Sequence, residues 1–433
     1  MTSSNDRRNS ERSIVEDSFE KELRDRARER LQEREDALHG AQHSTPQRKS
    51  KVGTEGKATL NGRHARHEVP SDALAPASPR GALPFSGRPL LGVLLAVLVI
   101  VLLAVFISST VSRCDKSEED VASEPQQVAQ VQQEEQQSEA SEEVQAVSFD
   151  PSPQELDNIP SSSGIETFSL SNASVPEISE EQRSAIQEAL DNATEQGDIG
   201  FVFYSLETGR GISYNADATV YGASSFKGPY ALYICESLVE SGTISLDSAC
   251  TGTTLYDSSS YYNGGSYMVS DLIDDAIIYS DNNAYGSLRD SYDTMGFDEW
   301  ATGVGADDAT YRADSWYPWY CARSSAKLWT EMYNYLESNT ETATYLSALL
   351  GQTETSFIRD ALQDTNALVK DKAGWCSDSD PNYNGVCDAG IVSVDGHPFV
   401  LSVMTGMADS EQNRLLFQEI ARSVFETNET LSA

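Results

Sequence analysis

The sequence predicts an α/β protein of the α+β type, in which the N-terminal and C-terminal parts of one domain form a single antiparallel sheet. Two observations predict this sheet. Residues 200–216 indicate two strands around a Glu-Thr-Gly turn, and residues 388–406 indicate a hairpin that turns at Asp395-Gly396. The segments between them have helical patterns. We therefore expect helices on both faces of the sheet and an all-helical subdomain inserted between the strands.

Five helices are expected in this domain. Residues 179–196 begin with a Ser cap and carry acidic residues in the first turn, which predicts the first helix. An apolar run that follows Lys227 and continues to Leu238 predicts the second. The other three are expected at about 268–279, 324–337 and 410–426.

Only part of the 433-residue chain has the composition of a globular domain, namely residues 176–433. Residues 1–88 hold 17 of the 31 Lys and Arg and are polar, which predicts a charged, mostly disordered segment. Within it, residues 11–38 indicate a solvated helix, and a partner-binding helix is the alternative. Residues 113–175 form an acidic tract rich in Glu, Gln and Ser, which predicts a linker.

The 24 residues between Arg88 and Arg113 carry no charge. Such a stretch is long enough to cross a hydrocarbon core of about 30 Å, which predicts one transmembrane helix at 89–112. The long polar segment before it disfavours the alternative of a cleaved signal peptide. The Lys and Arg excess in that segment predicts a single-pass protein of the cell membrane, with a cytoplasmic N-terminus and an extracytoplasmic C-terminal domain.

The composition also restricts the partners of the C-terminal domain. Residues 1–88 carry a net charge of +3 and the remainder of the chain carries −40, which argues against nucleic acid or anionic lipid as a partner of the C-terminal domain. No Cys/His spacing indicates a metal, and we expect no cofactor. Disulfides can persist outside the membrane, and Cys376 and Cys387 are close enough in sequence to join one hairpin. The pairing of the three remaining extracytoplasmic cysteines stays open: Cys235, Cys250 and Cys321.

The first candidate motif is Ser-x-x-Lys at 224–227, which opens the apolar helix. The first turn places the Ser224 hydroxyl and the Lys227 amine on one face. A lysine at the start of a buried helix loses hydration, so its amine deprotonates more easily and can accept a proton from the hydroxyl. A helix cap with a snorkelling lysine is the alternative. The chain matches this pattern three times, including Ser324/Lys327, so the motif alone is weak evidence.

Two further motifs follow in order: Ser-Asp-Asn at 280–282, after an apolar helix, and Lys-Ala-Gly at 372–374, leading into a strand. Together the three resemble the signature of the serine penicillin-recognising enzymes, which are the class A β-lactamases and the penicillin-binding D,D-peptidases. The resemblance covers roughly residues 176–430. It implies a β-lactamase/transpeptidase-like fold and a serine hydrolase.

The resemblance also implies catalytic roles. Ser224 would be the nucleophile that attacks an amide or β-lactam carbonyl, and Lys227 would be its proton acceptor or part of that proton relay. Ser280 would pass the proton to the leaving nitrogen.

The implied substrate-binding residues are Asn282, Lys372, Gly374 and Trp375. Asn282 would hold the substrate's amide side chain, and Lys372 would supply positive potential for its carboxylate. Gly374 belongs to the third motif. The backbone N–H groups of Ser224 and Trp375 would form the oxyanion hole.

Two departures from the family pattern matter. Ala373 stands where the family has Ser or Thr, and the missing hydroxyl should weaken recognition of the substrate carboxylate by about 1–2 kcal/mol. Residues 301–330 contain neither Glu nor Asn, whereas class A enzymes place there a Glu that activates the deacylating water. Either Asp314 substitutes, or the Trp/Tyr-rich segment 315–320 only packs a differently built loop and deacylation is slow.

Three functions remain open. The first is a membrane-anchored, extracytoplasmic β-lactamase. The second is a D,D-peptidase-like hydrolase that acts on cell-wall peptides. The third is a slow-deacylating penicillin-binding sensor that reports through the cytoplasmic segment. The sequence does not decide between a β-lactam and a cell-wall peptide as the substrate, and it gives no oligomeric state.

Overall fold

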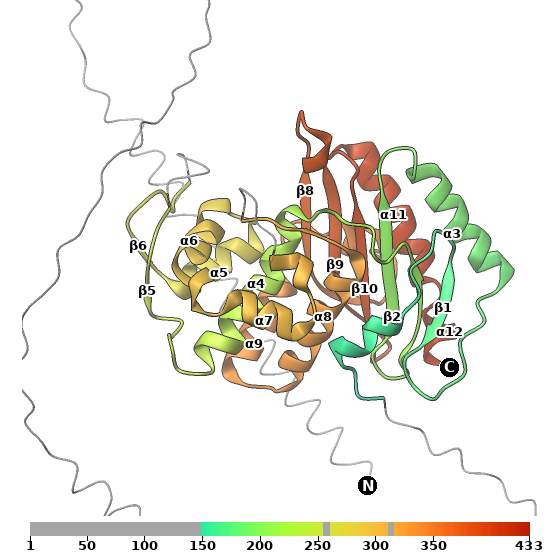
Figure 1. Ribbon diagram of the computed structural model, residues 1–433, viewed down its shortest axis with the longest axis horizontal. Coiled ribbons are helices and arrows are strands. Elements are labelled where there is room, and N and C mark those ends of the chain that lie inside the picture. The colour runs from blue at the N-terminus through green and yellow to red at the C-terminus, as the bar shows by residue number, and fades with distance from the viewer. Residues whose placement is uncertain (1–148, 254–259, 311–315) are drawn as a thin grey trace, which may run out of the picture. The chain divides into compact units, whose positions relative to one another are not determined.

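A six-stranded antiparallel sheet forms the centre of the computed structural model, which describes residues 149–253, 260–310 and 316–433. Its strand order is β1-β3-β2-β10-β9-β8 (Figure 1). In that order the strands are Glu166–Ser169, Arg210–Tyr214, Ile199–Ser205, His397–Thr405, Gly385–Val394 and Leu368–Cys376. The predicted sheet built from both ends of the domain is therefore confirmed.

The junction between the two ends of the domain is the pairing of β2 with β10. It runs from Ile199 opposite Thr405 to Ser205 opposite Phe399. All seven residues of β2 are buried, because the sheet is covered on both faces. The predicted hairpin is β9–β10, and Asp395 and Gly396 in its turn both have positive φ.

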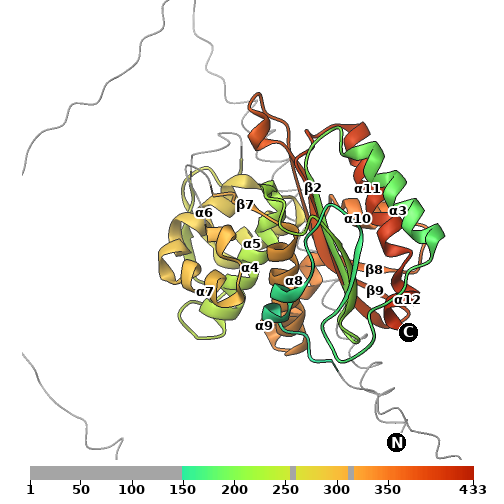
Figure 2. The same cartoon turned by 45° about the vertical axis from the view of Figure 1, so that its right-hand side comes forward.

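One face of the sheet is covered by helices from the two ends of the domain (Figure 2). These are α3 (Glu180–Ala193), α10 (Phe357–Ala361), α11 (Glu411–Phe425) and α12 (Asn428–Ser432). The predicted cap of the first helix is Ser179, whose hydroxyl accepts from Gln182 N while the Gln182 side chain accepts from Ser179 N. Phe203, Leu401 and Phe417 are among the buried residues of this layer.

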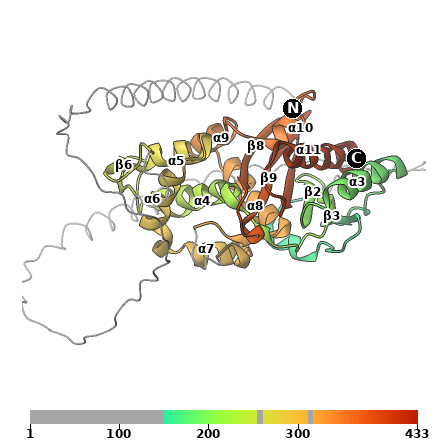
Figure 3. The same ribbon diagram turned by 90° about the horizontal axis from the view of Figure 1, so that it is seen from above.

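The helical subdomain lies on the other side of the sheet, where α8 packs against β2, β9 and β10 (Figure 1). Its helices are α4 (Lys227–Tyr233, continued by a π-helical segment Ile234–Val239), α5 (Val269–Ile278), α6 (Asn282–Tyr292), α7 (Phe297–Val304), α8 (Ala322–Glu337) and α9 (Glu341–Leu350). Viewed from above, α4, α5 and α6 lie beyond β8, and α3 lies at the opposite end of the domain (Figure 3). The edge strand β8 therefore faces the helical subdomain.

Two short strand pairs complete the fold. They are β4 (Val220–Tyr221) with β7 (Trp319–Tyr320), and β5 (Ala249–Thr251) with β6 (Ser266–Met268). Strand β4 of the first pair lies directly before the Ser-x-x-Lys motif. Its pairing with β7 therefore joins the residues after 315 to the start of that motif.

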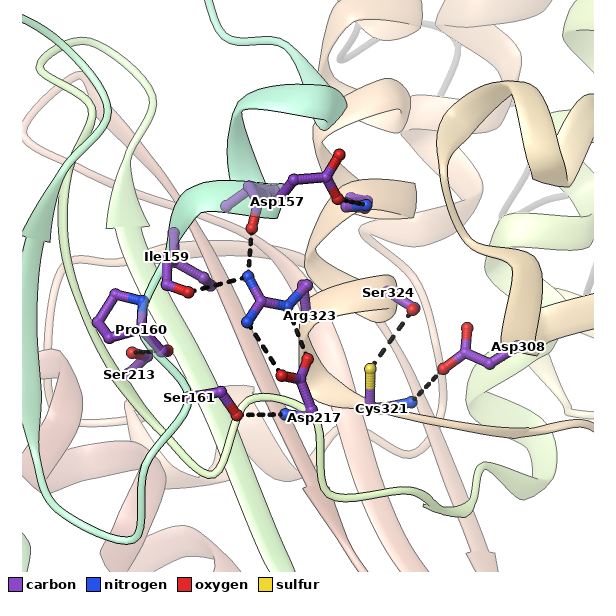
Figure 4. Close-up of polar contacts among 12 residues, drawn as sticks. Asp157, Ile159, Pro160, Ser161, Ser213, Asp217, Asp308, Cys321, Arg323 and Ser324 are labelled. Carbon is purple, nitrogen blue, oxygen red and sulfur yellow. Dashed lines mark hydrogen bonds and ion pairs between the residues drawn. The ribbon is translucent and has the colours of Figure 1, made fainter.

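The described residues include part of the predicted linker, and this part has secondary structure. A 3₁₀ helix, Pro153–Asn158, and strand β1 both precede residue 176. The fully buried Leu156 packs in the core, and its carbonyl oxygen accepts from Arg323 of α8. Arg323 also donates to the carbonyl oxygen of Ile159 (Figure 4). A few apolar residues at fixed positions, together with buried cationic partners, order this stretch despite the polar composition of the tract before it.

The predicted disulfide between Cys376 and Cys387 is not formed, since both residues are free cysteines. The strand register explains this. Cys376 lies opposite Gly385, and Cys387 lies opposite Gly374, so the two cysteines are diagonal neighbours across β8 and β9. Diagonal neighbours are about 7–8 Å apart, whereas a disulfide needs Cα atoms about 4.4–6.8 Å apart. Cys235, Cys250 and Cys321 are also free.

No helix within the described ranges is both long and apolar enough to cross a membrane. The predicted transmembrane segment, 89–112, lies outside those ranges. The predicted cytoplasmic segment, 1–88, also lies outside them.

Candidate active site

Ser224 lies in a tight turn between β4 and α4, the 3₁₀ helix Ala223–Phe226. Ala223 has a φ of 45°, a strained value for a residue with a side chain, and the turn runs directly into α4. The next serine, Ser225, is fully buried, and its hydroxyl donates to Gly222 O at 2.7 Å and contacts Tyr320 Oη at 2.7 Å. Ser224 itself is only half-buried. The Ser224 side chain is therefore partly accessible to solvent, whereas the Ser225 side chain is buried and its hydroxyl is used in hydrogen bonds within the fold.

Strand β8 approaches the backbone of this turn closely at Gly374. A Cβ atom at Gly374 would lie 2.7 Å from Ser224 N and 2.2 Å from Ser225 N. Only glycine fits at such a distance. Gly374, and with it the neighbouring Trp375, therefore lies beside the predicted nucleophile, where the sequence places the second oxyanion-hole donor.

The Lys227 amine connects the first and second motifs. Its Nζ donates to Ser280 O at 2.6 Å, to Ser280 Oγ at 3.2 Å and to Asn282 Oδ1 at 2.8 Å. The residue is 1 % exposed, and burial lowers the pKa of its amine well below the usual value. The positive charge of Lys372 lowers this pKa further, while Asp281 opposes the shift. Burial and the Lys372 charge therefore make the Lys227 ammonium easier to deprotonate.

Ser280 lies where α5 ends and α6 begins, with a φ of 57°. The following Asp281 caps α6 by accepting from Ala284 N at 2.8 Å, and it also accepts from Ser260 Oγ. Asp281 therefore orders the turn, and the turn brings Ser280 and Asn282 to Lys227.

Lys372 lies on the same face of β8 as Gly374. Its Cβ contacts the position that a Cβ of Gly228 would occupy, at 3.2 Å, so the strand packs on the first turn of α4. Its amine donates to Ala373 O at 2.8 Å. Burial lowers the pKa of Lys372 to about 8, although the carboxyl groups of Asp388 and Asp371 oppose the shift. A cation is thus held next to the predicted nucleophile turn.

No acidic residue in the described part of residues 301–330 accepts a hydrogen bond from the Lys227 amine. Asp308 accepts from Cys321 N at 3.0 Å, which holds it at the start of α8 (Figure 4). Asp314, the predicted substitute for the missing Glu, lies outside the described residues.

The competing Ser-x-x-Lys match at 324–327 has a structural role. Lys327 forms an ion pair with Asp157 and donates to Gly305 O at 2.9 Å. The Ser324 hydroxyl contacts Cys321 Sγ at 3.4 Å, as Figure 4 shows. This motif therefore joins α8 to the 3₁₀ helix Pro153–Asn158 and takes no part in the site.

The structure brings together residues that the sequence places far apart: Ser224, Lys227, Ser280, Asn282, Lys372, Gly374 and Trp375. It also adds two tyrosines that sequence reasoning missed, Tyr285 and Tyr317, whose rings lie 5.6 and 5.7 Å from Lys227 Nζ. The Tyr317 hydroxyl donates to Asn282 Oδ1 at 2.7 Å. The high content of Trp and Tyr in residues 315–320 was a signal that aromatic side chains pack near the site. The sequence did not indicate which residues these side chains contact.

One protein family and several solved structures are similar to this chain. The profile of the "Beta-lactamase enzyme family" matches residues 181–427. No curated protein sequence matches the chain. A β-lactamase from Chitinophaga pinensis is similar in structure, with a TM-score of 0.50 and 20 % identity, covering 57 % of this chain and 99 % of that one.

Two other similar structures are a β-lactamase from Sphaerobacter thermophilus and PBP-A. The first has a TM-score of 0.49 and 17 % identity, and the second has 0.48 and 19 %. Each comparison covers 57 % of this chain and 97 % of the other.

Proposed function

The chain belongs to the beta-lactamase enzyme family and is a β-lactamase-like serine hydrolase, and we propose that β-lactams or related amides acylate it on Ser224. The observation that carries this proposal is the buried Lys227 amine, which lies within hydrogen-bond distance of the Ser280 hydroxyl next to an accessible serine. A neutral amine in this position is a base for the serine proton.

The proposed acylation step uses the residues as follows. The Ser224 oxygen bonds to the substrate carbonyl carbon while Lys227 accepts the hydroxyl proton. The bond between that carbon and the amide nitrogen breaks, and the proton passes through the Ser280 hydroxyl to the leaving nitrogen. The N–H groups of Ser224 and Trp375 stabilise the oxyanion, a role that the close approach of Gly374 to the turn supports.

Substrate recognition rests on two groups in this proposal. The exposed Asn282 presents its amide nitrogen to the amide side chain of the substrate. Lys372, at a pKa of about 8, carries a positive charge at neutral pH and attracts the substrate carboxylate. The absent hydroxyl at Ala373 leaves this attraction with fewer hydrogen bonds than the family pattern provides.

A second candidate function is a slow-deacylating penicillin-binding protein, either a D,D-peptidase or a sensor. The sequence of residues 301–330 favours it, because this loop lacks the Glu that activates the deacylating water in class A enzymes. Within the described residues, the Lys227 amine donates only to Ser280 and Asn282, and tyrosine rings flank it. No carboxylate there accepts a hydrogen bond from Lys227 to help activate a deacylating water.

The enzymatic test is a time course on the full chain with a chromogenic cephalosporin and with penicillin, followed by intact mass. Steady turnover that Ser224→Ala abolishes supports a β-lactamase, and a persistent adduct on the wild type supports the second candidate. Ser324→Ala is the matched control because it alters the other extracytoplasmic Ser-x-x-Lys motif. Full activity or a full adduct in Ser224→Ala contradicts the proposed nucleophile.

We further propose that the enzyme is anchored in the cell membrane through residues 89–112, with its domain outside. The uncharged length of this segment and the Lys and Arg excess before it support the proposal. The test adds protease to intact cells that carry the chain tagged at both ends. Loss of the C-terminal tag with survival of the N-terminal tag is expected, and survival of both tags contradicts the topology.

A further inference from the structure

The segment that follows residue 315 packs against one face of α6. Residues 282, 285, 286 and 289 lie on this face at helical spacing. The Trp316 ring lies over Gly286, where a Cβ would be 2.1 Å from the ring. The Trp316 carbonyl accepts from Tyr285 Oη at 3.0 Å and from the buried Arg289 Nη1 at 2.6 Å. The helix therefore fixes this segment through a ring, a carbonyl and a buried cation.

The next residue of the segment, Tyr317, is buried and reaches the site. Its hydroxyl donates to Asn282 Oδ1 at 2.7 Å, and the same oxygen accepts from Lys227 Nζ at 2.8 Å. The Tyr317 ring lies 5.7 Å from Lys227 Nζ, within the distance at which a ring face stabilises an ammonium. Tyr317 thus contacts the partner of the proposed base through its hydroxyl and lies beside the base with its ring.

These contacts determine the orientation of the Asn282 amide. An amide oxygen accepts two hydrogen bonds, and here Lys227 and Tyr317 donate both. The amide nitrogen is then directed away from them, and it makes no hydrogen bond within the described residues. The Lys227 bond varies when that amine gains and loses a proton during the reaction. The Tyr317 hydroxyl is the donor that remains constant.

We propose that Tyr317 is a positioning residue of this enzyme, which keeps the Asn282 amide nitrogen directed at the acylamino side chain of the substrate while Lys227 exchanges its proton. This inference rests on the proposed acylation of Ser224. It assigns a function to a segment in which the family's deacylating Glu is absent. Tyr317 contacts Asn282 and not the reacting atoms, so its effect depends on whether the substrate carries that side chain.

The kinetic test compares two substrates on the full chain with the wild type and Tyr317→Phe. Penicillin G carries an acylamino side chain, and 6-aminopenicillanic acid lacks it. We expect the second-order rate of acylation by penicillin G to fall about fivefold to tenfold in Tyr317→Phe, the effect of one lost hydrogen bond, and that by 6-aminopenicillanic acid to change less than twofold. An equal fall for both substrates overturns the proposal.

Tyr233→Phe is the matched control. It removes another buried tyrosine hydroxyl, which donates to Tyr292 O at 3.1 Å and lies outside the site. We expect it to leave the ratio of the two substrates unchanged. A change in this ratio as large as that of Tyr317→Phe would mean that loss of any buried hydroxyl disturbs the site, and it would overturn the specific role.

A second measurement does not depend on acylation. Urea unfolding of the wild type, Tyr317→Phe, Asn282→Ala and the double variant gives a double-mutant cycle. If the hydrogen bond exists, Tyr317→Phe shifts the unfolding midpoint in the wild-type background and has a smaller effect in the Asn282→Ala background. Equal effects in both backgrounds overturn the inference on its own. A clear coupling in a protein that penicillin does not acylate would instead contradict the proposed function, and the substrate-directed role of Tyr317 would be lost with it.

Discussion

Replacement of Gly374 by alanine tests whether β8 and the turn of Ser224 form one site. The added Cβ would lie 2.2 Å from Ser225 N, 2.5 Å from Gly222 O and 2.7 Å from Ser224 N. Ordinary contacts are at 3.4–4 Å, so the strand and the turn must separate by about 1 Å or more. All three contacts are backbone atoms, which cannot rotate away.

The expected cost has two parts. Overpacking of this kind destabilises a fold by about 1–3 kcal/mol. A displacement of about 1 Å between reacting groups lowers a rate by roughly 100-fold. We therefore expect acylation of Gly374→Ala by fluorescent penicillin to slow by about two orders of magnitude, with a modest fall in the urea midpoint.

Gly303→Ala is the control for this experiment. A Cβ at Gly303, within α7, would meet no atom within 4 Å, so this variant should acylate normally and gain about 0.5–1 kcal/mol of stability. A folded Gly374→Ala variant that acylates at the wild-type rate would refute the placement of β8 beside the nucleophile.

Three further predictions follow from the same structure. Because burial lowers the pKa of Lys372 to about 8, its positive charge is lost as the pH rises through about 8. The rate of acylation by penicillin G should then fall relative to the rate with the penicillin methyl ester, which has no carboxylate. A ratio of these two rates that stays constant with pH would exclude the proposed role of Lys372 in binding the carboxylate. In the unreduced, denatured chain, alkylation should label both Cys376 and Cys387, whereas a linked peptide in mass mapping would contradict the strand register. Removal of residues 149–175 deletes four buried apolar side chains, Leu156, Ile159, Ile165 and Phe168, and removes the two carbonyl partners of Arg323 in α8. At about 1.5–3 kcal/mol for each buried side chain, a chain that begins at 176 should lose at least about 6 kcal/mol in urea unfolding relative to one that begins at 148; equal stability would show that this segment is not part of the fold.

The sequence predicted those elements whose pattern is local. The sheet followed from two hairpins with clear turns, and α5, α8 and α11 followed from apolar periodicity. Helix α6 was not predicted, because Gly286 and several Asn and Ser residues lower its helix propensity and tertiary contacts with Trp316 and Arg289 stabilise it instead. Helix α9 was missed because it is buried nearly all round, with no polar face to produce a period.

The site was predicted as far as its motifs extended. The order of the three motifs along the chain indicated which residues come together in the site. The motifs carry no information about contacts from the loop at 315–320, whose sequence differs from that of the family. Tyr317 meets Asn282 only because α6 holds the preceding residue in place. Similarly, the Cys376–Cys387 prediction rested on sequence distance and did not take account of the register between β8 and β9.

The central claim is that Ser224 forms the acyl-enzyme, and the direct test is to locate the adduct. The full chain is treated with penicillin, quenched in acid, digested and mapped by mass spectrometry. The structure predicts a penicilloyl group on Ser224, none on the adjacent buried Ser225, and none in a Lys227→Met variant, which lacks the base. A penicilloyl group on Ser225 or Ser324, or an unchanged yield in Lys227→Met, would contradict the account.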